Sequence, residues 1–132
     1  MTNRIAVALT LLALLVAGCG GSGDSKTTSA AAGPDQAVKD AILKWTFEGD
    51  CDSMTDKFLE EQAFIGDNRQ ERCAYLTKTF QKPQYSPDDV KFRSVKVTGQ
   101  KATVVIGSDI SNITATYTLL QQGGKWRIDD AS

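Results

Sequence analysis

Histidine is absent from the 132-residue chain, and its absence limits the chemistry that the other polar side chains could do. Ser-His, Cys-His and Asp-His pairs, which activate nucleophiles or move protons near neutral pH, are excluded. An acid–base pair could still form between Asp109, at the end of one expected strand, and Tyr117 in the next. We favour a turn aspartate and a core tyrosine over this pair. A small lyase or isomerase with an Asp–Tyr pocket is the alternative function.

Acidic residues gather at Asp50, Asp52 and Asp56, but their spacing does not match a calcium-binding EF-hand loop. Helix capping and solvated surface positions explain these three residues better. Zinc is not expected either, because the chain has no histidine and two thiols cannot complete a tetrahedral shell. The sequence therefore predicts no catalytic residue, no metal and no cofactor.

An apolar leader precedes the first cysteine. Arg4 supplies one positive charge, and residues 5–17 are apolar apart from Thr10. This run is shorter than the roughly 20 residues that span a bilayer, and a charged start with a short apolar core is typical of a secretory signal. Val16-Ala17-Gly18-Cys19 resembles the lipobox of bacterial lipoproteins. The resemblance implies a signal peptide of residues 1–18, cleavage after it, and diacylglycerol on the Cys19 thiol.

A lipid on Cys19 would make the bilayer a partner of the protein. Two or more acyl chains hold a protein stably on a membrane, and we expect the extracytoplasmic face of the cell membrane, or the outer membrane where a cell has one. Without residues 1–18 the net charge changes from −1 to about −2, because Arg4 is lost. Since no basic run remains, nucleic acid is not an expected partner.

Cys51 and Cys73 are the two cysteines left in an exported chain, and we predict a disulfide between them. They are too far apart in the sequence for a Cys-x-x-Cys redox motif. A bridge closing a loop of this size stabilises a fold by about 3 kcal/mol in the chain-entropy model.

The segment after Cys19 predicts a tether, and the domain follows it. Residues 20–33 are small and polar, so they cannot bury enough apolar area to offset the entropy of ordering. With the lipidated Cys19, residues 19–33 form a flexible connection whose reach is roughly 20 Å. Residues 34–132 are then one domain.

Three helical segments are predicted in the first half of the domain. Val38, Ala41, Ile42 and Trp45 share one helix face, and Gly49 is a suitable stop. A second segment opens at residues 52–53. A third has Asn68 as its cap and Glu71 three residues on, and Pro83 ends it.

Four antiparallel strands are predicted after Pro83. Alternation changes phase at residues 93–94, which indicates a bulge. Residues 99–100 and 123–124 are expected turns, and Trp126 and Ile128 belong to the final strand. Helices followed by a meander predict an α+β fold, with three helical segments against one face of the sheet.

The closing Gly124-Lys125-Trp126-Arg127-Ile128-Asp129 resembles the end of the nuclear transport factor 2-like superfold. Gly49-Asp50-Cys51-Asp52, Met54-Thr55-Asp56 and Phe58-Leu59 resemble a group of small bacterial lipoproteins of unknown function with that fold. The resemblance covers residues 35–130 and implies a curved, cone-shaped roll. It does not fix a function, because this fold hosts unrelated activities.

Aromatic side chains are the remaining candidates for a binding site. In the resembling fold the usual ligand site lies between the helices and the curved sheet. Core packing is the favoured role of the aromatic residues, because a small domain has few apolar residues to spare. The residues that could instead line such a cavity are Trp45, Phe47, Phe92, Tyr117 and Trp126. We therefore expect a non-enzymatic binding module for a small apolar ligand or an envelope protein, with a homodimer as a further prospect.

Overall fold

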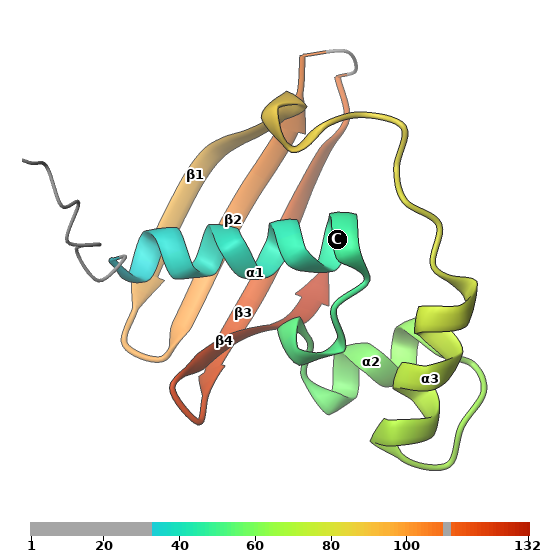
Figure 1. Cartoon of the computed structure of the whole chain (residues 1–132). Helices are drawn as coiled ribbons and strands as arrows, with labels where there is room; N and C mark the ends of the chain where they lie inside the picture. The colour runs from blue at the N-terminus through green and yellow to red at the C-terminus, as the bar shows by residue number, and fades with distance from the viewer. Residues whose placement is uncertain (1–32, 110–111) are drawn as a thin grey trace, which may run out of the picture.

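The structure is a computed structural model that describes residues 33–109 and 112–132. Its helical elements come first and its strands follow (Figure 1). The helical elements are α1 (Pro34–Glu48), a 3₁₀ turn η1 (Cys51–Ser53), α2 (Asp56–Gln62), α3 (Arg69–Thr79) and a 3₁₀ turn η2 (Pro87–Asp89). The strands are β1 (Val90–Thr98), β2 (Lys101–Ser108), β3 (Thr114–Gln122) and β4 (Lys125–Ala131). The predicted α+β class with three helices on a four-stranded antiparallel sheet is confirmed.

Helix α1 begins where the domain was predicted to begin and ends at the predicted stop. Pro34 stands in its first turn, where a missing N–H costs nothing. Gly49 ends the helix with a φ of 66°, in the left-handed region that glycine adopts without strain. A side chain at this position would also collide with the ring of Phe80, so the site needs glycine for two reasons.

The second helical segment differs from the prediction. Instead of one helix that begins at residues 52–53, the structure has the short turn η1 and a separate helix α2. Met54 between them forms an isolated bridge with Ile128 of β4. Thr55 then caps α2, because its side chain accepts the N–H of Phe58. The chain leaves the helical conformation here in order to pair with the sheet.

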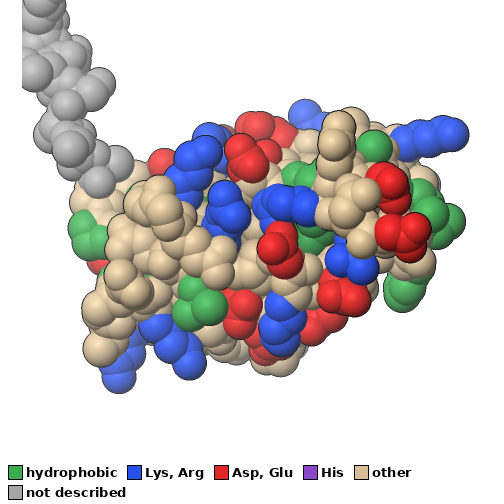
Figure 2. All heavy atoms as spheres, turned by 90° about the horizontal axis from the view of Figure 1, so that it is seen from below, with side chains coloured by type: hydrophobic (Ala, Val, Ile, Leu, Met, Phe, Trp, Pro, Cys, Tyr) green, Lys and Arg blue, Asp and Glu red, His purple; other side chains and the backbone are tan. Residues whose placement is uncertain are grey.

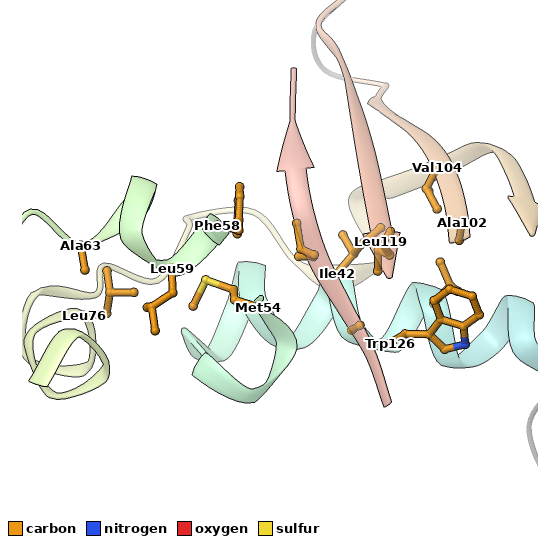
Figure 3. Packing of buried hydrophobic residues seen from close by; sticks show 13 residues of the cluster. Ile42, Met54, Phe58, Leu59, Ala63, Leu76, Ala102, Val104, Leu119 and Trp126 are labelled. Carbon is orange, nitrogen blue, oxygen red and sulfur yellow. The ribbon is translucent and has the colours of Figure 1, made fainter. Parts of the chain in front are cut away.

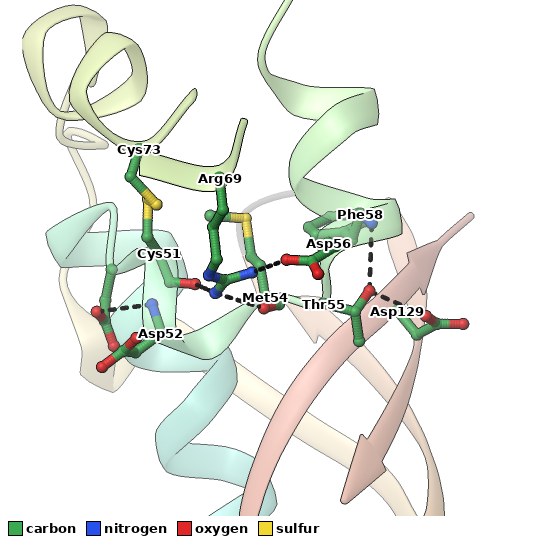
Figure 4. Close-up of polar contacts among 10 residues, drawn as sticks. Cys51, Asp52, Met54, Thr55, Asp56, Phe58, Arg69, Cys73 and Asp129 are labelled. Atoms are coloured by element: carbon green, nitrogen blue, oxygen red, sulfur yellow. Dashed lines mark hydrogen bonds and ion pairs between the residues drawn. A yellow bond between two sulfur atoms is a disulfide. The ribbon is translucent and has the colours of Figure 1, made fainter. Parts of the chain in front are cut away.

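Thr55 also joins the helices to the last strand (Figure 4). Its N–H donates to the carbonyl of Ile128 at 2.8 Å, and its Oγ1 donates to Asp129 Oδ1 at 2.9 Å. Only 3% of Thr55 is exposed. Together with the cap to Phe58, these two bonds fix where α2 starts and where it lies on β4.

Helix α3 begins as predicted and ends earlier. Asn68 accepts the N–H of Glu71 at 3.0 Å, as an N-cap should. The Glu71 carboxylate returns to the N–H of Asp67 at 2.9 Å, so it satisfies the residue before the cap rather than the cap itself. The helix ends at Thr79, ahead of Pro83, because Phe80 takes an extended ψ of 129° and packs beside Gly49.

The sheet is an antiparallel meander in the order β1-β2-β3-β4. The predicted bulge is confirmed, since the β1–β2 register shifts between Phe92 and Ser94. The turns at residues 99–100 and 123–124 are also confirmed. A second register shift, between Thr118 and Leu119 opposite β4, was not predicted.

The core lies between the helices and one face of the sheet (Figure 3). α1 crosses this face and contacts β1 and β4, while α2 contacts β4 and α3 (Figure 1). The fully buried side chains come from both layers: Val38, Ile42, Met54, Leu59, Val104, Leu119 and Ile128. Burying each such side chain contributes about 1.5–3 kcal/mol relative to exposure.

The predicted signal peptide, Cys19 and the predicted tether up to residue 32 lie outside the described residues. Within residues 33–109 and 112–132, no helix has both the length and the apolar character needed to cross a bilayer.

Candidate functional site

Cys51 and Cys73 form the predicted disulfide, with their Cα atoms 5.7 Å apart. Cys51 lies in η1 and Cys73 in α3, so the bridge fastens the turn after α1 to the third helix (Figure 4). Arg69 makes a second connection between the same elements. Its guanidinium donates to the carbonyls of Cys51 and Met54 at 2.7 and 3.0 Å and pairs with Asp56 at 2.6 Å. The sequence reasoning missed Arg69, which carries no motif of its own.

An apolar pocket of about 340 Å³ lies at the end of the sheet where β1 begins and β2 ends. Its lining combines aliphatic side chains with two tyrosines and a few polar groups: Tyr85, Asp89, Val90, Ile106, Gly107, Ser108, Ile113, Ala115 and Tyr117. Strand register brings the strand residues of this lining together, because Ile106 pairs with Ala115 and Val90 pairs with Ser108. The volume is at the lower end of the range for small-molecule sites.

Tyr85 and Ile113 form exposed parts of this pocket. Tyr85 is 47% exposed and Ile113 is 74% exposed, although both side chains are largely apolar. Tyr85 sits in the loop before η2, and its ring meets Phe47 edge-on at 5.5 Å between centroids. Each would lose apolar exposed area if a ligand filled the pocket, and this loss favours binding.

The five aromatic residues proposed for one cavity do not share it. Tyr117 lines the apolar pocket, and Phe47 reaches it only through its contact with Tyr85. Phe92 is the register partner of Ile106, but its ring lies under Lys39 Nζ at 5.5 Å. Packing on α1 accounts for the division, because this helix crosses the sheet and separates the two ends of its inner face.

The two tryptophans lie away from the apolar pocket. Trp45 packs edge-on against Phe58 at 6.0 Å, where it covers the core near α2. Trp126 is 7% exposed and borders a different hollow beside the β3–β4 turn. Both therefore serve mainly to cover the core.

That second hollow has the same volume, about 340 Å³, but a different lining. Charged side chains of Asp40, Lys44, Asp50, Asp52 and Lys125 surround it. Several of them already interact with each other or with the backbone: Asp50 accepts from Ser53 at 2.8 Å, and Lys125 pairs with Asp52 at 3.6 Å. The apolar pocket is the better ligand site, because its lining offers apolar area rather than satisfied charges.

Two titratable groups that line the apolar pocket have shifted pKa values. Burial raises the pKa of the Tyr117 phenol, and the nearby Tyr85 adds to the shift. Hydrogen bonds from the Ser86 N–H and hydroxyl lower the pKa of Asp89. At neutral pH the phenol is therefore protonated and can donate a hydrogen bond, while the carboxylate is ionised.

Asp109 does not line the pocket with Tyr117. Its carboxylate is 72% exposed and pairs with Lys91 at 3.6 Å. The Asp109–Tyr117 pair of the alternative function is thus not assembled, and the pocket instead contains Asp89, which sequence reasoning did not select. Among residues 33–109 and 112–132, no cluster of three or more Asp, Glu, Cys or His side chains could hold a metal ion.

Most of the pocket lining was missed at the level of sequence. The partnership of Ile106 with Ala115 follows from the β2–β3 register and could have been found by aligning the two strands across their connection. Tyr85 gives no such signal, because it lies in a loop between Pro83 and η2 whose path depends on tertiary packing.

Comparison with known proteins adds one distant likeness. No protein-family model and no curated protein matches the chain. A solved structure of an NTF-2-like protein of unknown function from Silicibacter pomeroyi DSS-3 is similar, with 17% sequence identity and a TM-score of 0.34. The match covers 73% of this chain and 87% of that chain. At so low a TM-score, the fold class rests on the observed layers and strand order, three helices against a four-stranded antiparallel meander.

Proposed function

We propose that the protein is a lipid-anchored, extracytoplasmic binding module that holds a small apolar ligand in the pocket lined by Tyr85 and Tyr117. One observation carries the proposal: a pocket of about 340 Å³ whose lining is mostly aliphatic and aromatic, with a protonated phenol at its wall. Such a lining retains an apolar molecule, and a single hydrogen-bond donor can orient it.

The anchored location is supported by the sequence before the domain. The apolar run at residues 5–17 and the lipobox-like Val16-Ala17-Gly18-Cys19 favour export and acylation. The Cys51–Cys73 disulfide is consistent with an oxidising compartment, where such bonds persist.

Binding suits the pocket better than turnover. A general base works best when its pKa lies near the operating pH. The hydrogen bonds to Asp89 move its pKa away from that range, and burial moves the pKa of Tyr117 away from it in the other direction. These pKa shifts make both groups poor at exchanging protons near neutral pH, which favours roles in hydrogen bonding.

The binding test uses two isoleucines of similar exposure. Ile113 lines the pocket and is 74% exposed, whereas Ile65 is 62% exposed in the α2–α3 connection and does not line it. The neutral fluorescent probe N-phenyl-1-naphthylamine is titrated into the protein and into the Ile113→Ser and Ile65→Ser variants. We expect Ile113→Ser to weaken binding by about tenfold, the effect of losing most of one buried aliphatic side chain. Equal affinity in both variants would show that the probe does not enter this pocket.

Catalysis is tested on any ligand that the pocket retains. Ligands extracted with the protein are incubated with it and followed by mass spectrometry, alongside Tyr117→Phe and Asp89→Asn variants. We expect no conversion in any sample. Conversion by the unaltered protein that either variant abolishes would replace the binding function by a small lyase or isomerase.

Anchoring is tested through Cys19. Intact-mass analysis of protein from the membrane fraction should show cleavage before Cys19 and a diacylglyceryl addition, and Cys19→Ala should leave the uncleaved, unmodified chain. An unmodified Cys19 in membrane-bound protein would contradict the anchor.

A further inference from the structure

One face of the sheet is turned away from all helices of the described chain. Ala102, Val104 and Leu119 are buried against the helices, so the side chains that alternate with them point outward. We call this the outer sheet face. Register places its residues in rows across the strands, of which one contains Thr98, Lys101, Leu120 and Arg127 and the next contains Lys96, Thr103, Thr118 and, at the β4 edge, Asp130.

Basic side chains lie on this face without acidic partners. Lys96 and Lys101 are exposed, and Arg93 at the bulge lies over Gly107 of β2. Arg127 alternates with the buried Trp126 and Ile128, and its Nε is buried without a hydrogen-bond partner among the described residues. Of the ion pairs between described residues, none involves these four cations.

The acidic side chains of the strand half are already paired. Asp109 is held by Lys91 at 3.6 Å. Asp130 and Asp129 lie 3.5 and 4.0 Å from Lys57, which reaches them from α2. The outer sheet face therefore presents unpaired positive charge over threonine side chains.

Charge divides between the two halves of the domain. Residues 33–89 contain twelve acidic and seven basic residues, whereas residues 90–132 contain six basic and three acidic ones. Both signs mix over the right-hand part of Figure 2, while a group of Lys and Arg side chains stands apart at its lower left. A domain with this asymmetry turns its basic side toward an anionic surface.

We propose that the outer sheet face docks on anionic phospholipid headgroups and so orients the domain on the membrane. The proposal rests on the lipid anchor proposed above. Residue 33, where the tether would join, immediately precedes α1, and α1 begins beside β1 (Figure 1). A tether with a reach of roughly 20 Å keeps the domain close enough for Lys96 and Lys101 to meet the headgroups. The helices then face away from the bilayer.

Lysine labelling measures this orientation directly. The acylated protein is reconstituted in vesicles of phosphatidylcholine, or of phosphatidylcholine with about one third phosphatidylglycerol, and treated with a membrane-impermeant amine reagent. Each basic residue near an anionic surface contributes roughly a fivefold preference, so labelling of Lys96 and Lys101 should slow by at least about fivefold on the anionic vesicles. Lys78 and Lys82, exposed in and after α3, should label equally on both. High salt should remove the difference, because it screens exposed charges.

Charge reversal supplies the matched controls. Arg93→Glu should restore most of the labelling of Lys96 and Lys101 on anionic vesicles, whereas Lys82→Glu, with the same change in net charge, should leave their protection intact. Unchanged labelling of both variants on neutral vesicles shows that neither substitution disturbs the fold.

Three outcomes would overturn the proposal. If Lys96 and Lys101 label as fast as Lys78 and Lys82 on both vesicles while the protein stays membrane-bound, docking is refuted and the anchor is left intact. If Lys96 and Lys101 label slowly on both vesicles, something other than anionic lipid, such as a second copy, covers the face. Recovery of the protein in the vesicle-free supernatant refutes the anchor itself.

Discussion

Replacing Thr55 by alanine removes one hydroxyl that serves two elements at once. Thr55 Oγ1 accepts the N–H of Phe58 at 3.2 Å and donates to Asp129 Oδ1 at 2.9 Å. The substitution leaves the backbone bond from Thr55 to Ile128 in place. It therefore tests the side chain alone, as the cap of α2 and as the connection between α2 and β4.

The magnitude follows from the two bonds. Loss of a threonine N-cap costs about 1 kcal/mol. A hydrogen bond to a charged group contributes about 1.5–3 kcal/mol, and we take the lower end because the Asp129 side chain is 24% exposed. Alanine also lacks the buried methyl group of Thr55, which adds about 1 kcal/mol to the loss. We expect the free energy of unfolding to fall by roughly 3–4 kcal/mol, a large part of the 5–15 kcal/mol that is typical of a domain. The melting temperature should fall by roughly 15–25 °C in a domain of this size.

Urea denaturation of the unaltered protein, Thr55→Ala and Thr55→Ser measures this loss. Serine keeps the hydroxyl and removes one buried methyl group, which costs about 1 kcal/mol. The midpoint should shift without a change in slope, because the same surface is exposed on unfolding. The Thr55→Ala/Asp129→Ala double variant should be about 1 kcal/mol more stable than the sum of the single changes predicts.

A free energy of unfolding for Thr55→Ala within about 0.5 kcal/mol of that for Thr55→Ser would refute this reasoning, since the two differ chiefly in the hydroxyl. Additive effects of Thr55→Ala and Asp129→Ala would refute the side-chain bond between α2 and β4 while leaving the cap intact.

Three further predictions concern the fastening of the helices and the pocket. Reduction of the Cys51–Cys73 disulfide should lower the free energy of unfolding by about 3 kcal/mol, and non-reducing peptide mapping should recover the linked peptides; two free thiols in freshly isolated protein would contradict the bridge. Arg69→Lys should cost roughly 1–2 kcal/mol, because one ammonium cannot reach both carbonyls and Asp56 in the same planar arrangement, whereas the exposed Arg93→Lys should be neutral in the same denaturation assay. The lowered pKa of Asp89 contributes stability that is present above its unfolded pKa, near 3.8, and is lost as pH falls through the lower folded pKa. Asp89→Asn should therefore flatten the dependence of the free energy of unfolding on pH below about pH 4. An unchanged dependence would show that the Ser86 bonds do not persist in solution.

Local signals in the sequence predicted much of the fold. Gly49 ends α1, Asn68 starts α3, and the change of phase at residues 93–94 marks the bulge. These features depend on neighbours within a few residues, so the sequence expresses them directly. The break at Met54 depends on Ile128, which lies on the last strand, and no local pattern announces that contact.

The candidate site was harder to predict than the helix ends, because it too depends on contacts between residues far apart in the sequence. Tyr117 was selected because strand alternation turns it inward, and it does line the pocket. Tyr85 and Asp89 join it from a loop and from η2, which residue spacing does not place near β3. Asp109 was chosen because it ends the strand before that of Tyr117, but its carboxylate is exposed and pairs with Lys91.

The bridge between Met54 and Ile128 sets an order of events as the chain is synthesised. Synthesis from the N-terminus delivers α1, Cys51 and Cys73 long before β4. The Cys51–Cys73 loop is short, but Thr55 has no partner on the sheet until residues 125–131 emerge, because α1 and α2 both pack on β4. Closing the long loop between these segments is slow, since its entropy cost must be met before the contacts form. The domain therefore closes only when its last strand arrives.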